Sequence, residues 1–412
     1  MEADPPFYPG QFRTTAPRAY RRSLAEGRLT DDDRRIIEEY LSERQATRQI
    51  GNQRVLKMRY HLITWRRFIA QPYAEMTIGD VYAGLNALQT GESRRGKPFK
   101  QNSKHDYIVV LKSFVLWLIA NSYSTIRAEK IRDIRVPSVD HNTTRPEALL
   151  TPDEINKLLT GCRSVRDRAI VAVLYESGAR VGEVARLRWR DVEFDKYGVR
   201  VYIHDTKENQ VRYARCTWAR EMLAAWQAVY PMPVTPDAWV FVSSRKEAMN
   251  YDQIRQRVKM AAGRADLGKR VHLHLFRKSR ATHMIQRNFQ ESVIKKMLWG
   301  NLNTSMFETY VVLSEADIDA EVLGHAGIET KEHEPDPLAP VPCPNCHAIC
   351  APVSRFCSSC GQALSVEAAE ELVSAKGIIW QNPEMLLEIA ADIRRRKEAA
   401  ASQPKEITGQ PA

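Results

Sequence analysis

The chain has 412 residues, more than one ordinary domain, and its 43% hydrophobic and 27% charged residues are the balance of a folded globular protein rather than a disordered one. The longest apolar run, which begins at Ile108, is interrupted and shorter than the roughly 20 residues that cross a bilayer, so a transmembrane helix is not expected. The net charge of +11 favours polyanions as partners, and nucleic acid is the commonest large polyanion in a cell.

The start of the chain carries acidic residues and prolines but no apolar core of the length that a signal peptide needs. Four of the seven cysteines form a spacing that requires free thiols rather than disulfides. We therefore expect a cytoplasmic protein that does not bind a membrane.

Residues 1–30 are rich in proline and arginine and show no helical period, so we expect a flexible basic arm there. Residues 31–130 carry apolar side chains at steps of three and four, with arginine and lysine in the other directions, which predicts a small all-helical domain. The clearest apolar positions are Val55, Met58, Leu62, Trp65 and Ile69, followed by Ile108, Leu111, Val115, Leu118 and Ile119.

Residues 131–149 contain prolines and polar turn formers and are typical of a linker. Directly afterwards Thr151 and Glu154 have the spacing of a helix-capping box, so a second domain is expected over residues 150–323. Within it Gly178 is suited to ending a helix. Two alternating segments, GVRVYIHDT and QVRYARCTW, predict a β-hairpin.

A Pro-rich linker at 324–341 leads to a cysteine-containing segment at 342–363. Residues 364–412 predict an amphipathic helix around PEMLLEIAADIRRR with a disordered tail.

The cysteine-containing segment at 342–363 holds two C-x-x-C pairs, formed by Cys343 and Cys346 and by Cys357 and Cys360. Each pair can turn two thiolates toward one tetrahedral ion, so we expect a structural zinc in a zinc ribbon, with no open coordination position. His347 and Cys350 are alternative ligands.

Three short segments carry residues suited to binding a small anion. His274 and Arg277 are one helical turn apart, although an isolated pair of this kind is usually a solvated basic face. Arg180 follows the glycine that ends a helix, and Glu183 one turn on can orient its guanidinium or form an ordinary exposed salt bridge. Tyr310 lies near the end of the domain, where a tyrosine taken alone is usually a core aromatic. The combination is more informative than any single member.

This ordered set resembles the tyrosine recombinase, or phage integrase, family over roughly residues 30–323. The motifs that carry the resemblance are G-A-R-x-G-E at Arg180, H-x-F-R at His274, and a tyrosine about thirty residues later. The resemblance implies a mainly α fold with a small β-sheet (α+β), in which a helical core-binding (SAM-like) domain and a catalytic domain form a C-shaped clamp on DNA, with the zinc ribbon appended. Such a ribbon is more typical of archaeal than of bacterial members.

By the same resemblance, Arg180 and Arg277 are the two arginines that clamp the phosphate, and Glu183 supports them. His274 is the acid/base helper, and Lys207 in the hairpin turn protonates the leaving oxygen. Tyr310 is the nucleophile. The chain departs from the family at two positions. Lys278 stands where many members have a second histidine, and the segment LWGN places Asn301 at the site of the second His/Trp. Asparagine can still donate a hydrogen bond to a phosphate oxygen, and Trp299 is the alternative donor.

The implied reaction is a transesterification, in which the tyrosine attacks a DNA phosphodiester and a covalent 3′-phosphotyrosine is later reversed by another DNA hydroxyl, without a metal or nucleotide cofactor. The implied partner is double-stranded DNA at an attachment or recombination site, with no small-molecule substrate, and the implied assembly is a homo-tetramer on two DNA sites. Two alternatives remain, a type IB topoisomerase-like relaxing activity and a non-catalytic DNA-binding regulator of the same fold. A covalent adduct separates the regulator from the enzymes, and strand exchange between two sites separates the two enzymes.

Overall fold

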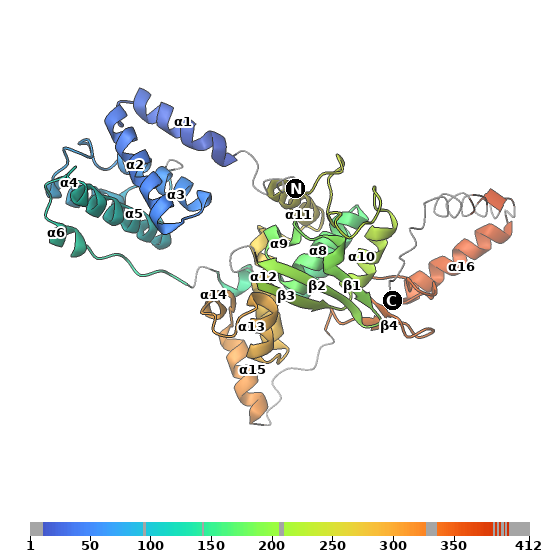
Figure 1. Cartoon of the computed structure of the whole chain (residues 1–412). Helices are drawn as coiled ribbons and strands as arrows, with labels where there is room; N and C mark the ends of the chain where they lie inside the picture. The colour runs from blue at the N-terminus through green and yellow to red at the C-terminus, as the bar shows by residue number, and fades with distance from the viewer. Residues whose placement is uncertain are drawn as a thin grey trace, which may run out of the picture. The chain divides into compact units, whose positions relative to one another are not determined.

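The computed structural model describes residues 11–93, 96–141, 144–205, 210–326 and 336–381, together with the single residues Glu384, Leu387, Glu388, Ala391 and Arg394. The chain divides into two compact units, and each is described by itself (Figure 1). One unit consists of Met1–Pro146 with Met249–Asp252 and Ser305–Val312, and the other of Glu147–Ala248, Gln253–Thr304 and Leu313–Ala412. No helix in the described ranges is both long enough and apolar enough to span a bilayer.

The first unit is helical. Its helices are α1 Gln11–Ala25, α2 Asp31–Arg48, α3 Asn52–Trp65, α4 Ile78–Thr90, α5 Gln101–Ala120, α6 Ala128–Arg132 and α14 Met306–Tyr310. The apolar positions predicted to pack are buried, except that Ile119 is half-buried. Aromatic rings fill the centre, where Phe114 meets Tyr40 and Tyr73 with ring centroids 5.1 and 4.9 Å apart. The helical period therefore identified the core of this unit correctly.

The expected flexible arm is wrong for the described part of residues 1–30, because α1 is a helix that packs on α3. Ala19, Tyr20 and Ser23 recur at helical spacing and are buried, and the Tyr20 hydroxyl donates to Glu38 at 2.6 Å. The proline at position 17 lies inside the helix, and with the surrounding arginines it obscures the short apolar face in the sequence. Residues 1–10 lie outside the described ranges.

The second unit is built around the helix α8 Val165–Ser177, whose residues from Ala169 onward are buried on every side. The helices around it and further along the chain are α7 Pro152–Gly161, α9 Val181–Val184, α10 Ala219–Ala228, α11 Tyr251–Arg264, α12 Leu273–Gln286, α13 Glu291–Trp299 and α15 Glu315–His325, with 3-10 turns at Pro146–Ala148 and Trp189–Asp191. The predicted capping box of Thr151 and Glu154 begins α7, and Gly178 ends α8, as expected.

A small antiparallel sheet lies beside these helices, with strands β1 Val192–Asp195, β2 Gly198–Asp205 and β3 Gln210–Cys216 in the order β1-β2-β3 (Figure 1). The strands β2 and β3 form the predicted hairpin, with Val201 opposite Ala214 on the buried face. Together with the helices, this sheet confirms a mainly α fold with a small β-sheet.

The last part of the chain contains the two-residue strands β4 Val341–Pro342 and β5 Ile349–Cys350, which pair with each other, and the helix α16 Val366–Gln381. The C-terminal helix was predicted later, around residues 383–396. Most of that segment and the predicted tail lie outside the described residues, whereas α16 follows the cysteine segment directly.

Candidate active site and cysteine cluster

Arg277 is the most deeply buried of the described residues that were predicted to bind the anion. This arginine lies in α12 and is 1% exposed. Its Nη1 donates to the carbonyl oxygen of Gly178 at 2.7 Å, its Nη2 donates to that of Leu298 at 2.7 Å, and its guanidinium carbon lies 4.9 Å from the ring centre of Trp299. Carbonyl oxygens and an aromatic face fix the guanidinium plane without neutralising its charge.

Gly178 makes this arrangement geometrically feasible. Its φ of 57° lies in the left-handed region that glycine adopts without strain, and it ends α8. A Cβ at this position would lie 2.4 Å from Cδ2 of Leu298 and 3.4 Å from Cγ of Arg280. Glycine therefore allows the end of α8 to approach α13 closely enough for both carbonyl oxygens to reach one guanidinium.

Arg180 is held by Glu183, as one of the two sequence alternatives predicted. The backbone N–H of Arg180 donates to Oε2 of Glu183 at 2.6 Å, and its Nη1 donates to Oε1 at 3.0 Å. The side chain of Glu183 is 9% exposed, whereas that of Arg180 is 39% exposed. A buried carboxylate that grips both ends of the arginine is not an ordinary surface salt bridge, so the guanidinium reaches solvent in a fixed position.

His274 lies one turn before Arg277 on α12 and keeps an exposed edge. Desolvation of part of its ring, followed by the positive charges of Arg277 and Lys278, lowers the pKa of His274 to about 4. Arg180 contributes to the same lowering, so its charge reaches this imidazole. At neutral pH the ring is therefore uncharged, which is the form able to accept a proton.

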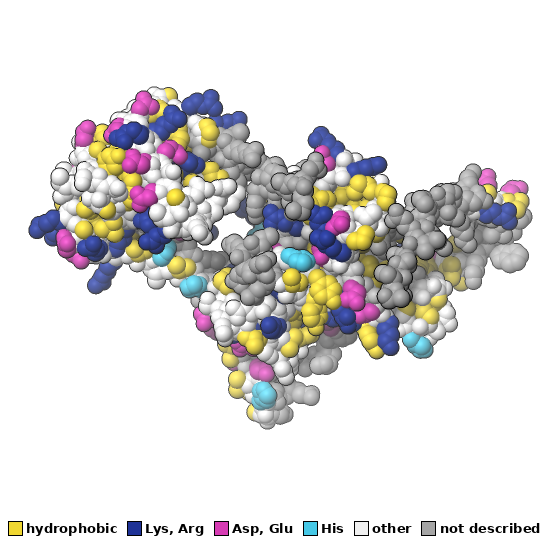
Figure 2. Space-filling model, in the orientation of Figure 1, with side chains coloured by type: hydrophobic (Ala, Val, Ile, Leu, Met, Phe, Trp, Pro, Cys, Tyr) yellow, Lys and Arg dark blue, Asp and Glu magenta, His cyan; other side chains and the backbone are white. Residues whose placement is uncertain are grey.

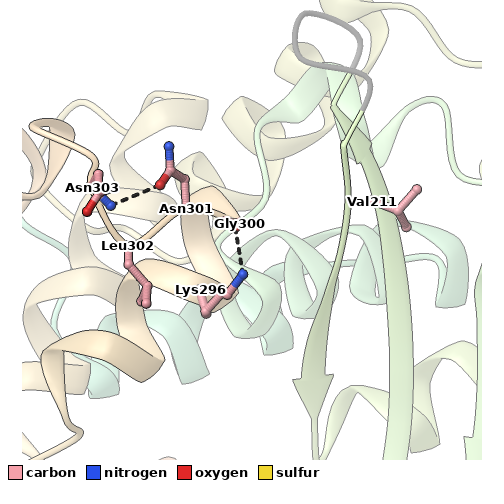
Figure 3. A pocket seen from close by; sticks show the side chains of 6 residues that line it. All are labelled: Val211, Lys296, Gly300, Asn301, Leu302 and Asn303. Atoms are coloured by element: carbon pink, nitrogen blue, oxygen red, sulfur yellow. Dashed lines mark hydrogen bonds between the residues drawn. The ribbon is translucent and has the colours of Figure 1, made fainter.

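Asn301 is exposed beyond the end of α13, and its Oδ1 accepts the backbone N–H of Asn303 at 2.9 Å. A hollow of about 530 Å³ is lined by Val211, Lys296, Gly300, Asn301, Leu302 and Asn303. Figure 3 draws these residues. Trp299, the alternative donor, has its ring against Arg277 and is 8% exposed. The role of either residue toward a phosphate stays a prediction.

Two predicted residues are not brought to this site by the described structure of the second unit. Lys207 lies between β2 and β3, outside the described residues. Tyr310 ends α14 and is 5% exposed, but this helix belongs to the first unit. The roles of both as proton donor and nucleophile therefore stay predictions.

Arg212 belongs to the site, although the sequence reasoning overlooked it. Its Nη2 donates to Oε2 of Glu183 at 2.8 Å, and its Nε donates to the carbonyl oxygen of Leu298 at 2.8 Å. The alternation of β3 puts it on the buried face with Ala214, which was the available signal, because a buried arginine in a strand requires dedicated acceptors. We call Arg180, Arg212 and Arg277 the arginine cluster.

The four predicted metal ligands come together at the end of the chain. Their sulfur atoms all lie within 4.8 Å of one another, in a group that consists of Cys343, Cys346, Cys357 and Cys360 and that we call the cysteine cluster. Burial acts to raise the pKa of Cys357. Hydrogen bonds from the backbone N–H groups of Cys360 and Ser359 and from the thiols of Cys346 and Cys343 outweigh it and lower this pKa to about 6. Four thiols around one point fit a tetrahedral soft-metal site with no open position.

Cys350 is not part of the cysteine cluster. It is buried in β5, and its sulfur contacts the carbonyl oxygen of Ala348 at 3.6 Å. His347 has a φ of 57° and lies in the turn after Cys346, outside the group of four. Neither alternative ligand is therefore needed to complete the set.

The segment with the cysteine cluster is attached to α10 by one carboxylate. Oε2 of Glu221 accepts the backbone N–H of Ala351 at 2.8 Å and the hydroxyl of Ser354 at 2.6 Å. Just upstream, Asp336 pairs with Arg287 at 2.6 Å. The cysteine segment is thus docked on the second unit rather than merely following it in the sequence.

The described residues combine a mainly helical fold and a small sheet with a fixed, cationic arginine cluster, an arrangement that is able to bind an oxyanion. Residues 148–316 match the model of the phage integrase family. This segment of the chain is therefore similar to the phage integrase (tyrosine recombinase) family.

Named relatives are similar in sequence to parts of this chain, and solved structures share its fold. The tyrosine recombinase XerC of Shewanella sp. (strain ANA-3) is 31% identical over 150 residues, which cover 36% of this chain and 49% of that protein. XerC of Xanthomonas campestris pv. campestris (strain B100) is 26% identical over 254 residues, covering 61% and 76%. A lambda integrase tetramer bound to a Holliday junction has the same fold, with a TM-score of 0.53, 16% identity, and coverage of 68% of this chain and 76% of that chain. The chain spans about half the length of the Shewanella relative.

Proposed function

We propose that the protein is a site-specific tyrosine recombinase that cuts and rejoins double-stranded DNA through a covalent 3′-phosphotyrosine. The observation that carries this proposal is the arginine cluster, in which Arg277 and Arg180 are oriented by backbone carbonyls and by Glu183 before any ligand binds. A phosphodiester is negative, and its pentacovalent transition state carries still more charge on the non-bridging oxygens. Fixed guanidinium groups stabilise that charge without having to reorganise.

The proposed step breaks one P–O bond and forms another. The Tyr310 oxygen attacks phosphorus, the 5′-oxygen of the DNA leaves, and the strand stays attached through its 3′-phosphate. His274 is uncharged at neutral pH and so can accept the tyrosine proton, while Lys207 supplies a proton to the leaving oxygen. A phenol, with an unperturbed pKa of about 10, is a better leaving group than a sugar hydroxyl, so the intermediate is reversible. Asn301 or Trp299 donates a further hydrogen bond to the phosphate.

Double-stranded DNA as partner agrees with the net charge of +11 and with the lysine and arginine side chains on the face of each unit seen in Figure 2. We propose that four copies act on two DNA sites, in line with the lambda integrase tetramer on its Holliday junction. The protein would act in the cytoplasm, where this substrate lies, and serve a mobile element.

The cysteine cluster is proposed to hold one structural zinc ion. Its four thiols suit a tetrahedral site, and the zinc would stabilise the ribbon without taking part in the DNA chemistry. The appended ribbon is also what favours an archaeal type of chain.

A second candidate function is a DNA-binding regulator that does not cut. One observation favours it, namely the exposed Asn301 at the position where the family has histidine or tryptophan. A type IB topoisomerase-like activity, the other alternative, would give the same covalent adduct without exchanging strands between two sites.

The test is capture of the covalent adduct. A pool of nicked duplexes with a randomised core is incubated with the protein, and DNA that stays attached in denaturing gels is recovered and sequenced. We expect an adduct with the wild type and none with Tyr310→Phe, which removes only the attacking oxygen and should bind the recovered duplex with nearly unchanged affinity. Tyr197→Phe, at a 57% exposed tyrosine, is the matched control. An adduct that persists in Tyr310→Phe would contradict the assignment, and no wild-type adduct would favour the regulator.

A further inference from the structure

We propose that Arg212 is a positioning residue that links the two phosphate-clamping arginines into one unit. The inference rests on the proposed function and deepens it. Arg212 is not among the residues that the family motifs indicate, and its placement follows from contacts within the second unit alone.

Each acceptor that Arg212 uses is shared with one of the other two arginines. Oε2 of Glu183 accepts from Nη2 of Arg212 at 2.8 Å and from the backbone N–H of Arg180 at 2.6 Å. The carbonyl oxygen of Leu298 accepts from Nε of Arg212 at 2.8 Å and from Nη2 of Arg277 at 2.7 Å. One rigid, planar guanidinium thus bridges the carboxylate behind Arg180 and the carbonyl behind Arg277.

The burial of these groups makes the bridge stiff. The side chains of Arg212 and Glu183 are 5% and 9% exposed, so water does not replace their contacts. Without Arg212, the carboxylate of Glu183 would keep only the contacts to its own helix turn, and its χ angles could relax. The separation of the two clamping guanidinium groups would then no longer be fixed, and catalysis by positioned charges falls steeply with small displacements.

One feature of Arg212 argues against a purely stabilising role. Its Nη1 is buried and makes no hydrogen bond in the described part of the chain. A buried donor without an acceptor costs stability, and an apolar side chain of similar volume would avoid that cost. An arginine at position 212 is explained if the hydrogen bonds of its Nε and Nη2 fix the positions of Leu298 and Glu183.

The strand itself offers a matched control. Arg215 also lies on β3, but on the opposite face, where its Nη1 pairs with Asp195 at 2.7 Å and its side chain is 31% exposed. The variants are Arg212→Gln, which removes the charge and the fork, Arg212→Lys, which keeps the charge but can reach only one acceptor, and Arg215→Gln. Each is first checked by its thermal melting temperature, and all rates are measured well below it.

The experiment measures two quantities on the duplex recovered by adduct capture, the single-turnover cleavage rate at saturating DNA and the DNA affinity. We expect Arg212→Gln to lower the cleavage rate by at least about tenfold with affinity within about twofold, Arg212→Lys to recover part of the rate, and Arg215→Gln to match the wild type. Combining Arg212→Gln with Glu183→Gln should add little to the loss, because both break the same bridge.

Two results for Arg212→Gln would overturn the inference. The first is a folded Arg212→Gln protein that cleaves at the wild-type rate. The second is a loss of cleavage rate that combines additively with the loss caused by Glu183→Gln. If Arg212→Gln does not fold, Arg212→Lys decides, and a wild-type rate for that variant would show that only the charge is needed. A wild type that forms no adduct removes the proposed function and this inference together, whereas a wild type that cleaves while Arg212→Gln cleaves equally well removes the inference alone.

Discussion

The arginine cluster and the cysteine cluster each gather side chains of one kind, but the partners of these side chains differ. Around the arginines the fold supplies the acceptors, which are the carboxylate of Glu183 and the backbone carbonyls of Gly178 and Leu298. Around the sulfur atoms the described contacts are with one another, with backbone N–H groups and with the side chain of Asn345. Folding alone therefore completes the arginine cluster, whereas the proposed zinc ion would hold the four sulfur atoms of the cysteine cluster together.

This difference predicts which perturbation each site tolerates. The arginine cluster should be sensitive to substitution and insensitive to chelators, because its contacts are internal. The cysteine cluster should be sensitive to both, because metal binding supplies its folding free energy. Three experiments test the comparison, from the largest expected effect to the smallest.

The largest effect is expected from the arginines themselves. Arg277→Ala or Arg180→Ala should slow cleavage of the captured duplex by at least about 100-fold, since each removes a preorganised donor to the transition state. Arg190→Ala is the control, because Arg190 pairs with Asp237 at the surface, where both side chains are more than half exposed. Near-normal cleavage rates in both cluster variants would mean that the H-x-F-R segment is only a structural helix.

Removal of metal should give an intermediate effect. A chelator, or Cys343→Ser, should make residues 341–363 sensitive to protease and release the Glu221 contact, while the arginine cluster and the melting of the rest of the chain change little. Zinc per chain and the cleavage rate are measured in parallel. Cys350→Ser is the matched control and should keep its metal, because that sulfur lies outside the cluster. A wild type without bound metal would contradict the zinc assignment.

The smallest effect is expected from pH. The pKa of His274 is about 4 in the folded chain, below the ordinary value of 6.5, so between these values the unfolded chain binds more protons. Stability is therefore present above pH 6.5 and is lost as pH falls through this window. Urea midpoints at pH 7 and pH 5 should differ less in His274→Gln than in the wild type, and His325→Gln, at an exposed histidine, should behave as the wild type. An unchanged difference in His274→Gln would show that desolvation and the neighbouring cations do not lower the pKa of this ring.

Those parts of the two sites that depend on residues close together in the sequence could be predicted. Gly178 and the turn to Glu183 were accessible because a helix end and a capping interaction have local signatures. The four cysteines were accessible because ligand spacing is itself the signal. The helix α1 was missed because an internal proline and many arginines masked a short buried face.

Other parts of the site could not be predicted from the sequence, for a physical reason. The acceptors of Arg277 and Arg212 include the carbonyl oxygen of Leu298, and a backbone oxygen leaves no trace in the residue type. The bridge through Arg212 exists only after β3 and α13 have packed together, so it depends on tertiary contacts that no local pattern encodes. The nucleophile role of Tyr310 likewise rests on the family resemblance alone.

The contacts of Arg277 also determine how much of the chain must be synthesised before the arginine cluster can form. One of its acceptors lies 99 positions earlier in the chain and the other 21 positions later. The guanidinium cannot be oriented until the ribosome has released the segment that ends α13, by which time α7 to α12 have already emerged. A nascent chain shorter than this lacks the assembled arginine cluster, so an incomplete translation product would lack the groups on which the proposed DNA cleavage depends.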